Sequence, residues 1–145
     1  MEIYSWNVNG IRSVAKKGFE SWFNSTKPEI LCLQEVRAEK DQLPEFLHDI
    51  EGYYSFWNPC QKKKGYSGVG ILSQIEPDEV NYGMGIDEFD EEGRIVQLVF
   101  PDWVLNSVYF PNGGQGEERL DYKLRFYDAF LENSLQWLEQ GKHVI

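Results

Sequence analysis

Runs of apolar residues alternate along the chain with segments whose apolar residues recur at helical spacing. The runs at 3–6 and 30–33 are typical of strands buried on both faces. Between them, residues 12–26 place apolar side chains three or four positions apart, which predicts a helix that ends before Pro28. The same patterns predict a short helix at 42–48 and strands at 53–57, 66–73, 94–100 and 103–109, the last three close enough to pair as antiparallel hairpins. The alternation favours an α/β fold.

The last part of the chain carries the longest helical pattern. Apolar residues recur every three or four positions from residue 117, and Gly141 is a suitable end for the helix. We expect this apolar stripe to lie on the sheet. The residues at 143–145 predict the start of another buried strand, so the chain is expected to end inside a strand. The stripe consists of Leu120, Leu124, Tyr127, Leu131, Leu135 and Leu138.

Composition favours a single globular domain. A chain of 145 residues with 41% hydrophobic residues can build a core of its own, which argues against disorder. Cys32 and Cys60 form neither a disulfide framework nor a metal-binding pattern, so we expect a reducing, cytoplasmic setting. No apolar segment approaches the length of a membrane span, and the first strand begins too early to leave room for a signal peptide. We therefore expect no membrane partner.

Charge is distributed unevenly along the sequence. A formal net charge of −10 would usually argue against a nucleic-acid partner. Residues 1–75 contain nine Lys or Arg and nine Asp or Glu, however, whereas residues 76–145 contain five and fifteen. We interpret the acidic run 76–92 as a solvated surface turned away from the substrate. The basic residues expected to balance it are Lys16, Lys17, Lys62, Lys63 and Lys64, and the last three are expected to make salt-sensitive contacts.

Two of the expected strands end at oxygen-bearing side chains. Asn7 follows the first strand, and Gln34 and Glu35 follow the second. Sheets of α/β proteins bind ligands beyond the carboxyl ends of their strands. A carboxylate beside an amide oxygen suits Mg²⁺, which keeps water or phosphate in its other positions. The pattern indicates a metal site. The alternative is structural, with Glu35 opening a helix and Asn7 capping a turn.

Five blocks of sequence strengthen the functional interpretation. They are SWNVNGIR (5–12), LCLQEVR (31–37), GYSGVGILS (65–73), EGRIV (92–96), and NSVYFPNGG (106–114) followed by ERLDYKLRFYDAF (118–130). Together they closely resemble, in the same order and over the whole chain, the exonuclease III family of apurinic/apyrimidinic endonucleases, within the endonuclease/exonuclease/phosphatase superfamily. One such block would carry little weight, but five collinear blocks are specific.

The resemblance implies a fold. Residues 1–145 would form a single partial domain, the first half of a four-layer α/β sandwich with a mixed, largely antiparallel sheet and helices on one face. The other face would then lack its partner and expose an apolar patch. The expected partner is the C-terminal half of the same domain. The family's GDFN and SDH blocks do not occur in the sequence, so we expect the 145 residues to be inactive alone.

The resemblance also implies a chemistry. It is that of a magnesium-dependent DNA phosphodiesterase of base excision repair, with Mn²⁺ as a substitute metal. The enzyme would cleave double-stranded DNA 5′ to abasic sites and would act on 3′ ends as a 3′ to 5′ exonuclease. Glu35 would be the metal carboxylate, and Asn7 would either ligate the metal directly or orient a water or a neighbouring acid. Tyr109 would touch the scissile phosphate as a hydrogen-bond donor or proton-transfer group.

The same blocks imply DNA contacts. Without the resemblance, Tyr109 would be read as a core tyrosine, and Arg119 would be expected to pair with Glu117, Glu118 or Asp121 on its own helix. Gln115 stands where some relatives carry an arginine inserted into the DNA, so insertion of that kind is not expected. The implied DNA-contacting residues are Arg37, Tyr66, Ser67, Asn112, Gln115 and Arg119, and Arg94 is a further candidate for a phosphate contact or an ion pair.

Two other functions remain open at this point. The first is another phosphoesterase of the superfamily, such as an inositol polyphosphate phosphatase, a sphingomyelinase or a deoxyribonuclease I relative. The blocks outside the metal site, such as GYSGVG and EGRIV, favour the DNA-repair branch. The second is a non-catalytic half-domain that serves as a binding or scaffold module.

Overall fold

The computed structural model describes all 145 residues and contains two four-stranded sheets. In the first sheet, the two strands that precede the Asn7 and Glu35 positions are parallel neighbours, and the remaining pairs are antiparallel. Its order is β1 (Ile3–Asn7), β2 (Ile30–Gln34), β4 (Val69–Ser73) and β3 (Tyr54–Asn58). The predicted mixed α/β class is therefore confirmed.

The second sheet is built from the remaining strands. The pairs β5–β6 and β6–β7 are antiparallel, whereas β7 and β8 are parallel and are joined by the longest helix. The order is β5 (Glu79–Asn81), β6 (Ile95–Val99), β7 (Trp103–Val108) and β8 (His143–Val144). The strand expected at the end of the sequence is thus present as a short edge strand.

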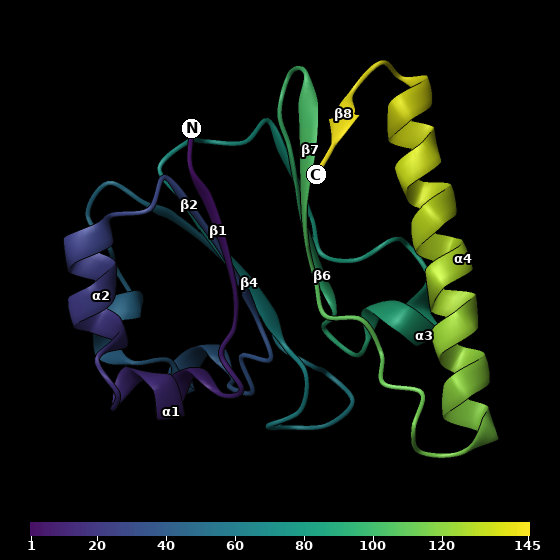
Figure 1. Cartoon of the computed structure of the whole chain (residues 1–145), viewed down its shortest axis with the longest axis horizontal. Coiled ribbons are helices and arrows are strands. Elements are labelled where there is room, and N and C mark those ends of the chain that lie inside the picture. The colour runs from purple at the N-terminus through teal and green to yellow at the C-terminus, as the bar shows by residue number, and fades with distance from the viewer.

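Helices cover the outer faces of both sheets, which gives four layers (Figure 1). On the first sheet lie α1 (Ile11–Ala15), α2 (Phe19–Thr26) and the 3₁₀ turns η1 (Lys40–Gln42) and η2 (Glu45–Leu47). On the second lie α3 (Asp87–Asp90) and α4 (Glu117–Glu139). No helix combines the length and the apolar character that crossing a membrane requires.

The two sheets pack face to face through alternate residues of their strands. From the first sheet, Ile30, Cys32 and Ile71 point inward and meet Val96 and Leu98 of the second. Fully burying such an aliphatic side chain contributes roughly 1.5–3 kcal/mol. The expectation that one sheet face would lack a partner is therefore wrong, because this chain supplies both sheets and their inner faces cover each other.

The core outside the first sheet is aromatic. Phe19 and Phe23 of α2 are buried, and Trp6 and Trp22 meet edge to face with ring centroids 5.2 Å apart. The helix expected over residues 12–26 is divided in two at Gly18, whose φ of 95° lies in the left-handed region. The break lets α1 and α2 run in different directions as separate segments (Figure 1).

Helix α4 packs on the second sheet through a different face from the one predicted. Tyr122 and Phe126 are buried against Phe89 of α3, with ring centroids 5.2 and 5.5 Å apart. The expected leucine stripe is wrong as a packing surface, because all six of its side chains are exposed. The aromatic residues offer larger apolar surfaces at the positions that face α3 and the sheet.

Candidate active site

Three loops meet at the lower edge of the sheets in Figure 1, where β1 and β2 end and β4 begins. The Gly10 N–H donates to the Glu35 carbonyl at 2.8 Å, and the Arg37 N–H donates to the Ser67 carbonyl at 2.9 Å. Asn9, Glu35, Arg37 and Ser67 all have φ between 45° and 53°. Non-glycine residues rarely adopt this conformation, and clusters of them are typical of functional sites. The backbone is therefore held in a costly arrangement around Glu35.

The Glu35 side chain is gripped from two sides and remains 14% exposed. The Asn7 amide Nδ2 donates to one carboxylate oxygen at 3.0 Å, and the Arg37 guanidinium donates to the other at 2.7 Å. The Asn9 N–H donates to the Asn7 amide oxygen at 3.1 Å, which fixes the orientation of that amide. Asn7 therefore presents its NH₂ group to Glu35, a geometry suited to orienting the carboxylate.

Two ionisable groups are coupled at the site. Burial alone would raise the pKa of Glu35, but hydrogen bonds from Asn7 and Tyr109 and the charge of Arg37 outweigh it and lower the pKa. Burial, together with the hydrogen bond to Glu35 and its negative charge, raises the pKa of Tyr109 above 10. At neutral pH the pair therefore consists of a carboxylate and a protonated phenol that can donate a hydrogen bond.

Arg94 connects this pair to a second cluster. Its guanidinium lies 5.2 Å from the centre of the Tyr109 ring and 5.5 Å from that of Tyr66. It also donates to the Tyr109 carbonyl at 3.0 Å and to the Tyr66 hydroxyl at 2.7 Å. Because Arg94 is only 1% exposed, these contacts hold both tyrosines in fixed positions.

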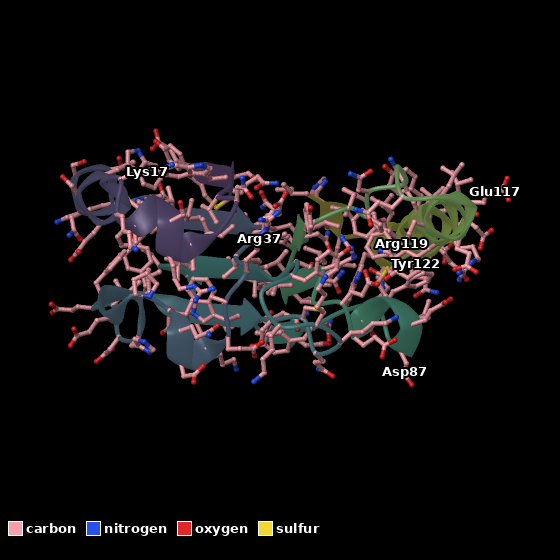
Figure 2. All side chains as sticks on the ribbon, turned by 90° about the horizontal axis from the view of Figure 1, so that it is seen from below. Lys17, Arg37, Asp87, Glu117, Arg119 and Tyr122 are labelled. Atoms are coloured by element: carbon pink, nitrogen blue, oxygen red, sulfur yellow. The ribbon has the colours of Figure 1, made fainter.

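Glu92 balances the charge of this cluster. Its carboxylate, 3% exposed, accepts from Arg94 at 2.8 Å and from Arg119 at 2.9 and 3.1 Å. The predicted ion pair of Arg119 is thus present, but with Glu92 on the loop before β6 and not with an acid of its own helix. In the view from below, Arg119 lies beside Tyr122 (Figure 2), and its guanidinium is 4.2 Å from that ring centre.

Glu92 was not among the residues expected from the sequence. It closes an acidic run, which is usually a solvated surface. The signal that distinguishes it is the EGRIV block itself, in which an acid and an arginine flank a glycine just before a buried strand. Gly93 has a φ of 61°, and a Cβ there would come within 2.6 Å of the Pro59 carbonyl carbon. The tight turn at Gly93 places the charged side chains of Glu92 and Arg94 in the protein interior.

Three residues expected to contact DNA lie differently. Ser67 is buried, and its hydroxyl donates to the Gly93 carbonyl at 3.3 Å, which links two loops. Asn112 accepts from the Gly114 N–H at 2.9 Å, so its exposed side chain shapes the loop before α4. Gln115 is exposed on the same loop. Among these three, only Asn112 and Gln115 present their side chains to solvent.

A basic pocket of about 460 Å³ is lined in part by Arg37, the ion-pair partner of Glu35. It is lined by no hydrophobic residue, and its charged side chains are Arg12, Lys16 and Arg37. Arg12, on α1, donates to the Arg37 carbonyl at 3.2 Å, which ties α1 to the loop after β2. Figure 2 shows Arg37 near the middle of the molecule, between its two halves. Such a pocket suits an anion that reaches the Glu35 site.

The donor set around Glu35 fits part of a magnesium site. No group of three or more His, Cys, Asp or Glu comes together in the chain, so a site made only of such residues is absent. Magnesium differs from zinc in needing only one or two protein carboxylates while water and phosphate fill the other positions. A partly exposed carboxylate held in place by an amide meets that requirement.

A family model and the sequences of known proteins point to the same family. The model of the Endonuclease/Exonuclease/phosphatase family matches residues 4–145. An exodeoxyribonuclease of Bacillus subtilis is 40% identical over 148 residues, covering all of this chain and 56% of the relative. The DNA repair nuclease APEX1 of Danio rerio is 42% identical over 146 residues, covering all of this chain and 47% of the relative. The chain thus spans about half the length of these curated relatives.

A solved structure of similar fold supports the same family. The 3′ phosphatase from Neisseria bound to a product DNA hairpin superimposes with a TM-score of 0.83 at 25% identity. The superposition covers 99% of this chain and 55% of the Neisseria chain. The two-sheet arrangement is therefore shared with a phosphoesterase seen in complex with DNA.

Proposed function

The chain belongs to the endonuclease/exonuclease/phosphatase family, and on that basis we propose that it forms the N-terminal half of a magnesium-dependent DNA phosphodiesterase of the exodeoxyribonuclease III and AP endonuclease type. The observation that carries the proposal is the Glu35 carboxylate, fixed by hydrogen bonds from Asn7 and Arg37 at the end of β2. Its substrates would be double-stranded DNA with abasic sites and DNA 3′ ends.

Glu35 would hold the metal, with Mn²⁺ as a substitute for Mg²⁺. When bound, the ion supplies positive charge beside the reacting phosphate. Asn7 keeps the carboxylate in one orientation, because its own amide is locked by Asn9. Arg37 neutralises part of the carboxylate charge and also lines the basic pocket.

Tyr109 would act as a hydrogen-bond donor to the scissile phosphate. The raised pKa of Tyr109 keeps its phenol protonated through the neutral range. The hydroxyl can therefore donate a proton or a hydrogen bond. Arg94 fixes the ring and the backbone carbonyl of Tyr109. A donor held in advance stabilises developing charge without having to reorganise during the reaction.

The basic pocket would bind the DNA backbone next to the reacting phosphate. Arg12, Lys16 and Arg37 supply the charge, and guanidinium groups pair well with phosphate oxygens. The Lys62–Lys64 loop would add salt-sensitive contacts. Tyr66, Asn112, Gln115 and Arg119 would contact the DNA from the second cluster and from the loop before α4. Completion of the active site would require the C-terminal half of the domain.

A hybrid protein tests this function directly. In the hybrid, residues 1–145 are followed by the part of Bacillus subtilis exodeoxyribonuclease that lies beyond the aligned region. We expect the hybrid to cleave a duplex on the 5′ side of a single abasic-site analogue when Mg²⁺ is present, and to be inactive after EDTA treatment. The intact Bacillus enzyme is the positive control. Hydrolysis of a phosphoinositide but not of the abasic duplex would assign the chain to another branch of the superfamily.

Replacing Tyr109 by phenylalanine in this hybrid tests the role of its hydroxyl. We expect kcat for abasic-site cleavage to fall by about 10²- to 10³-fold, the usual effect of removing one transition-state donor. Steady-state kinetics at saturating Mg²⁺ measures the effect. Tyr54→Phe is the matched control, because that tyrosine is exposed on β3 and its hydroxyl donates only to Glu76. Equal kcat values for the two variants would exclude Tyr109 from the reaction.

A further inference from the structure

A second pocket, of about 400 Å³, lies between α4 and the strands β5 and β6 of the second sheet. Val96 and Leu98 face the first sheet, so Gln97 between them faces the outer side, where α4 lies (Figure 1). The volume falls within the range of roughly 300–1,000 Å³ that is typical of small-molecule sites. None of the residues assigned above to the phosphodiesterase site lines this pocket, which we call the amide pocket.

A network of side-chain amides is built around Gln97, which is only 1% exposed. Its amide oxygen accepts from the Trp137 indole N–H at 3.1 Å and from the Asn81 NH₂ at 3.2 Å. Its own NH₂ donates to the amide oxygens of Asn106 at 2.7 Å and Asn133 at 2.9 Å. An amide side chain has two acceptor and two donor positions, so all four positions of Gln97 are used.

Trp137 fixes the orientation of every amide in this network. An indole N–H can only donate, so the group of Gln97 that meets it must be the oxygen. Asn81 must then present its NH₂ to that oxygen, and Asn133 must present its oxygen to the Gln97 NH₂. This leaves the Asn81 oxygen as a free acceptor and the Asn133 NH₂ as a free donor. No buried polar side-chain atom lacks a partner, so both free groups are open to solvent.

The loop after β5, which forms another part of the lining, is rigid. The Asp90 carboxylate accepts from the backbone N–H groups of residues 84, 85 and 86 at 2.8, 2.8 and 3.0 Å. A Cβ at Gly83, whose φ is 123°, would come within 2.3 Å of Asp90, so the loop depends on glycine at this position. The pocket is therefore formed in advance of any ligand, which lowers the entropic cost of binding.

The lining indicates the chemical class of the ligand. Asp90 is the only charged residue in it, and both oxygens of its carboxylate are occupied by backbone N–H groups. The amide pocket therefore offers no cation to an anionic ligand. Tyr82 and Trp137 contribute aromatic rings. Asn81 and Asn133 contribute the free acceptor and the free donor, on amides that are bonded to the same Gln97 side chain. Such a lining suits an uncharged, flat ring that carries a donor next to an acceptor.

We propose that the amide pocket binds a pyrimidine base with an imide edge, uracil or thymine, as the free base or the nucleoside. The ring N–H donates to the Asn81 oxygen, and a neighbouring carbonyl of the base accepts from the Asn133 NH₂. An imide N–H has a carbonyl on each side, so the base can meet the two asparagines in either orientation. Tyr82 and Trp137 provide the aromatic surfaces on which bases stack. This site goes beyond the proposed phosphodiesterase function and does not depend on it.

Nuclear magnetic resonance of the ¹⁵N-labelled 145-residue chain, titrated with thymidine, tests the proposal. We expect saturable shifts of the Trp137 indole signal and of the Asn133 side-chain amide signal. In 3-methylthymidine a methyl group replaces the hydrogen of the ring N–H, so this nucleoside should bind at least about tenfold more weakly. The sugar 2-deoxyribose is the ligand control and should shift neither signal, because it carries no base.

A variant tests the free donor separately. Asn133→Asp keeps an oxygen that accepts from Gln97 and replaces the free NH₂ by a second oxygen. We expect thymidine to bind this variant at least about tenfold more weakly than wild type. Gln136→Glu is the matched control, because it makes the same change from amide to acid at an exposed position of α4 and should bind as wild type does.

Two results would overturn the proposal. The first is the absence of saturable shifts at Trp137 and Asn133 with thymidine, which would leave the amide network with the role of holding α4 on the sheet. The second is equal affinity for thymidine and 3-methylthymidine, which would exclude the ring N–H from recognition. Both comparisons use the wild-type chain, so they decide the matter even where Asn133→Asp does not fold. Binding does not require catalysis, so an inactive hybrid would count against the proposed function only.

Discussion

Replacing Glu92 by alanine is expected to lower the free energy of unfolding of the 145-residue chain by about 3–5 kcal/mol, the usual cost of breaking a buried ion pair. The variant leaves Arg94 and Arg119 facing each other with no carboxylate between them, and Arg94 is 1% exposed. Urea unfolding followed by tryptophan fluorescence measures the change. Glu132→Ala is the matched control, because Glu132 is an exposed acid on α4 and should cost less than about 1 kcal/mol.

The pH dependence of the stability difference between wild type and Glu92→Ala gives an independent check. Burial alone would raise the pKa of Glu92, but hydrogen bonds from Arg119 and Arg94 outweigh it and hold the pKa below its ordinary value of 4.5. A carboxyl whose pKa is lowered by folding stabilises the folded state above its unfolded pKa, and this is lost as the pH falls through the folded value. The difference between wild type and Glu92→Ala should therefore be constant from pH 7 to about 5.5 and shrink below about 4. A constant difference down to pH 3 would contradict this assignment.

The meeting of Asn7 and Glu35 beyond the first two strands was predictable from the sequence, because the two buried apolar runs are easy to recognise. The runs at 3–6 and 30–33 form the parallel pair β1 and β2, whose register sets Asn7 opposite Gln34. Glu35 is the next residue, so its side chain and that of Asn7 meet beyond the same end of the sheet. The long helix from 117 and the edge strand at the end of the chain were likewise predicted by period and by turn residues.

Helix α4 shows why periodicity alone was insufficient. Its sequence carries two apolar rows, the leucine-rich stripe that was expected to face the sheet and a row with Tyr122, Phe126 and Phe130. Both rows have helical spacing, so the period does not say which one faces the sheet. The aromatic row packs because α3 and Phe110 form its surroundings, and α3 lies in a run that reads as solvated acid. Its partners became visible only in three dimensions.

The pairing of two sheets was missed for a related reason. Strand β5 spans three residues and lies in the acidic run, so the sequence predicted a single sheet and no second one to cover it. Inward-facing residues alternate with outward-facing ones on β2, β4 and β6, and both kinds are mostly apolar because both faces of these strands are buried. A strand buried on both faces carries no signal of what covers each face. The buried Arg94 and Glu92 pair was hidden by the same assembly of loops.

Replacing Glu35 by glutamine in the hybrid is expected to reduce kcat/KM for abasic-site cleavage by about a thousandfold at low Mg²⁺. The charge stabilisation supplied by a bound metal ion is worth several kcal/mol, and each 1.4 kcal/mol is a factor of ten. Glutamine keeps the size of the side chain and an oxygen that accepts from Asn7, so the loops should retain their positions. The unfolding midpoint of the variant, measured alongside, separates loss of metal from loss of structure.

Titration of the hybrid with Mn²⁺, followed by the electron paramagnetic resonance of the free ion, tests the central claim most directly. The wild-type hybrid should bind Mn²⁺ and release it to excess Mg²⁺, and Glu35→Gln should weaken binding at least tenfold. Glu139→Gln, at the exposed end of α4, is the matched control and should bind as wild type does. Equal Mn²⁺ affinity in wild type and Glu35→Gln would contradict the account, because the ion would then be held without the carboxylate at the end of β2.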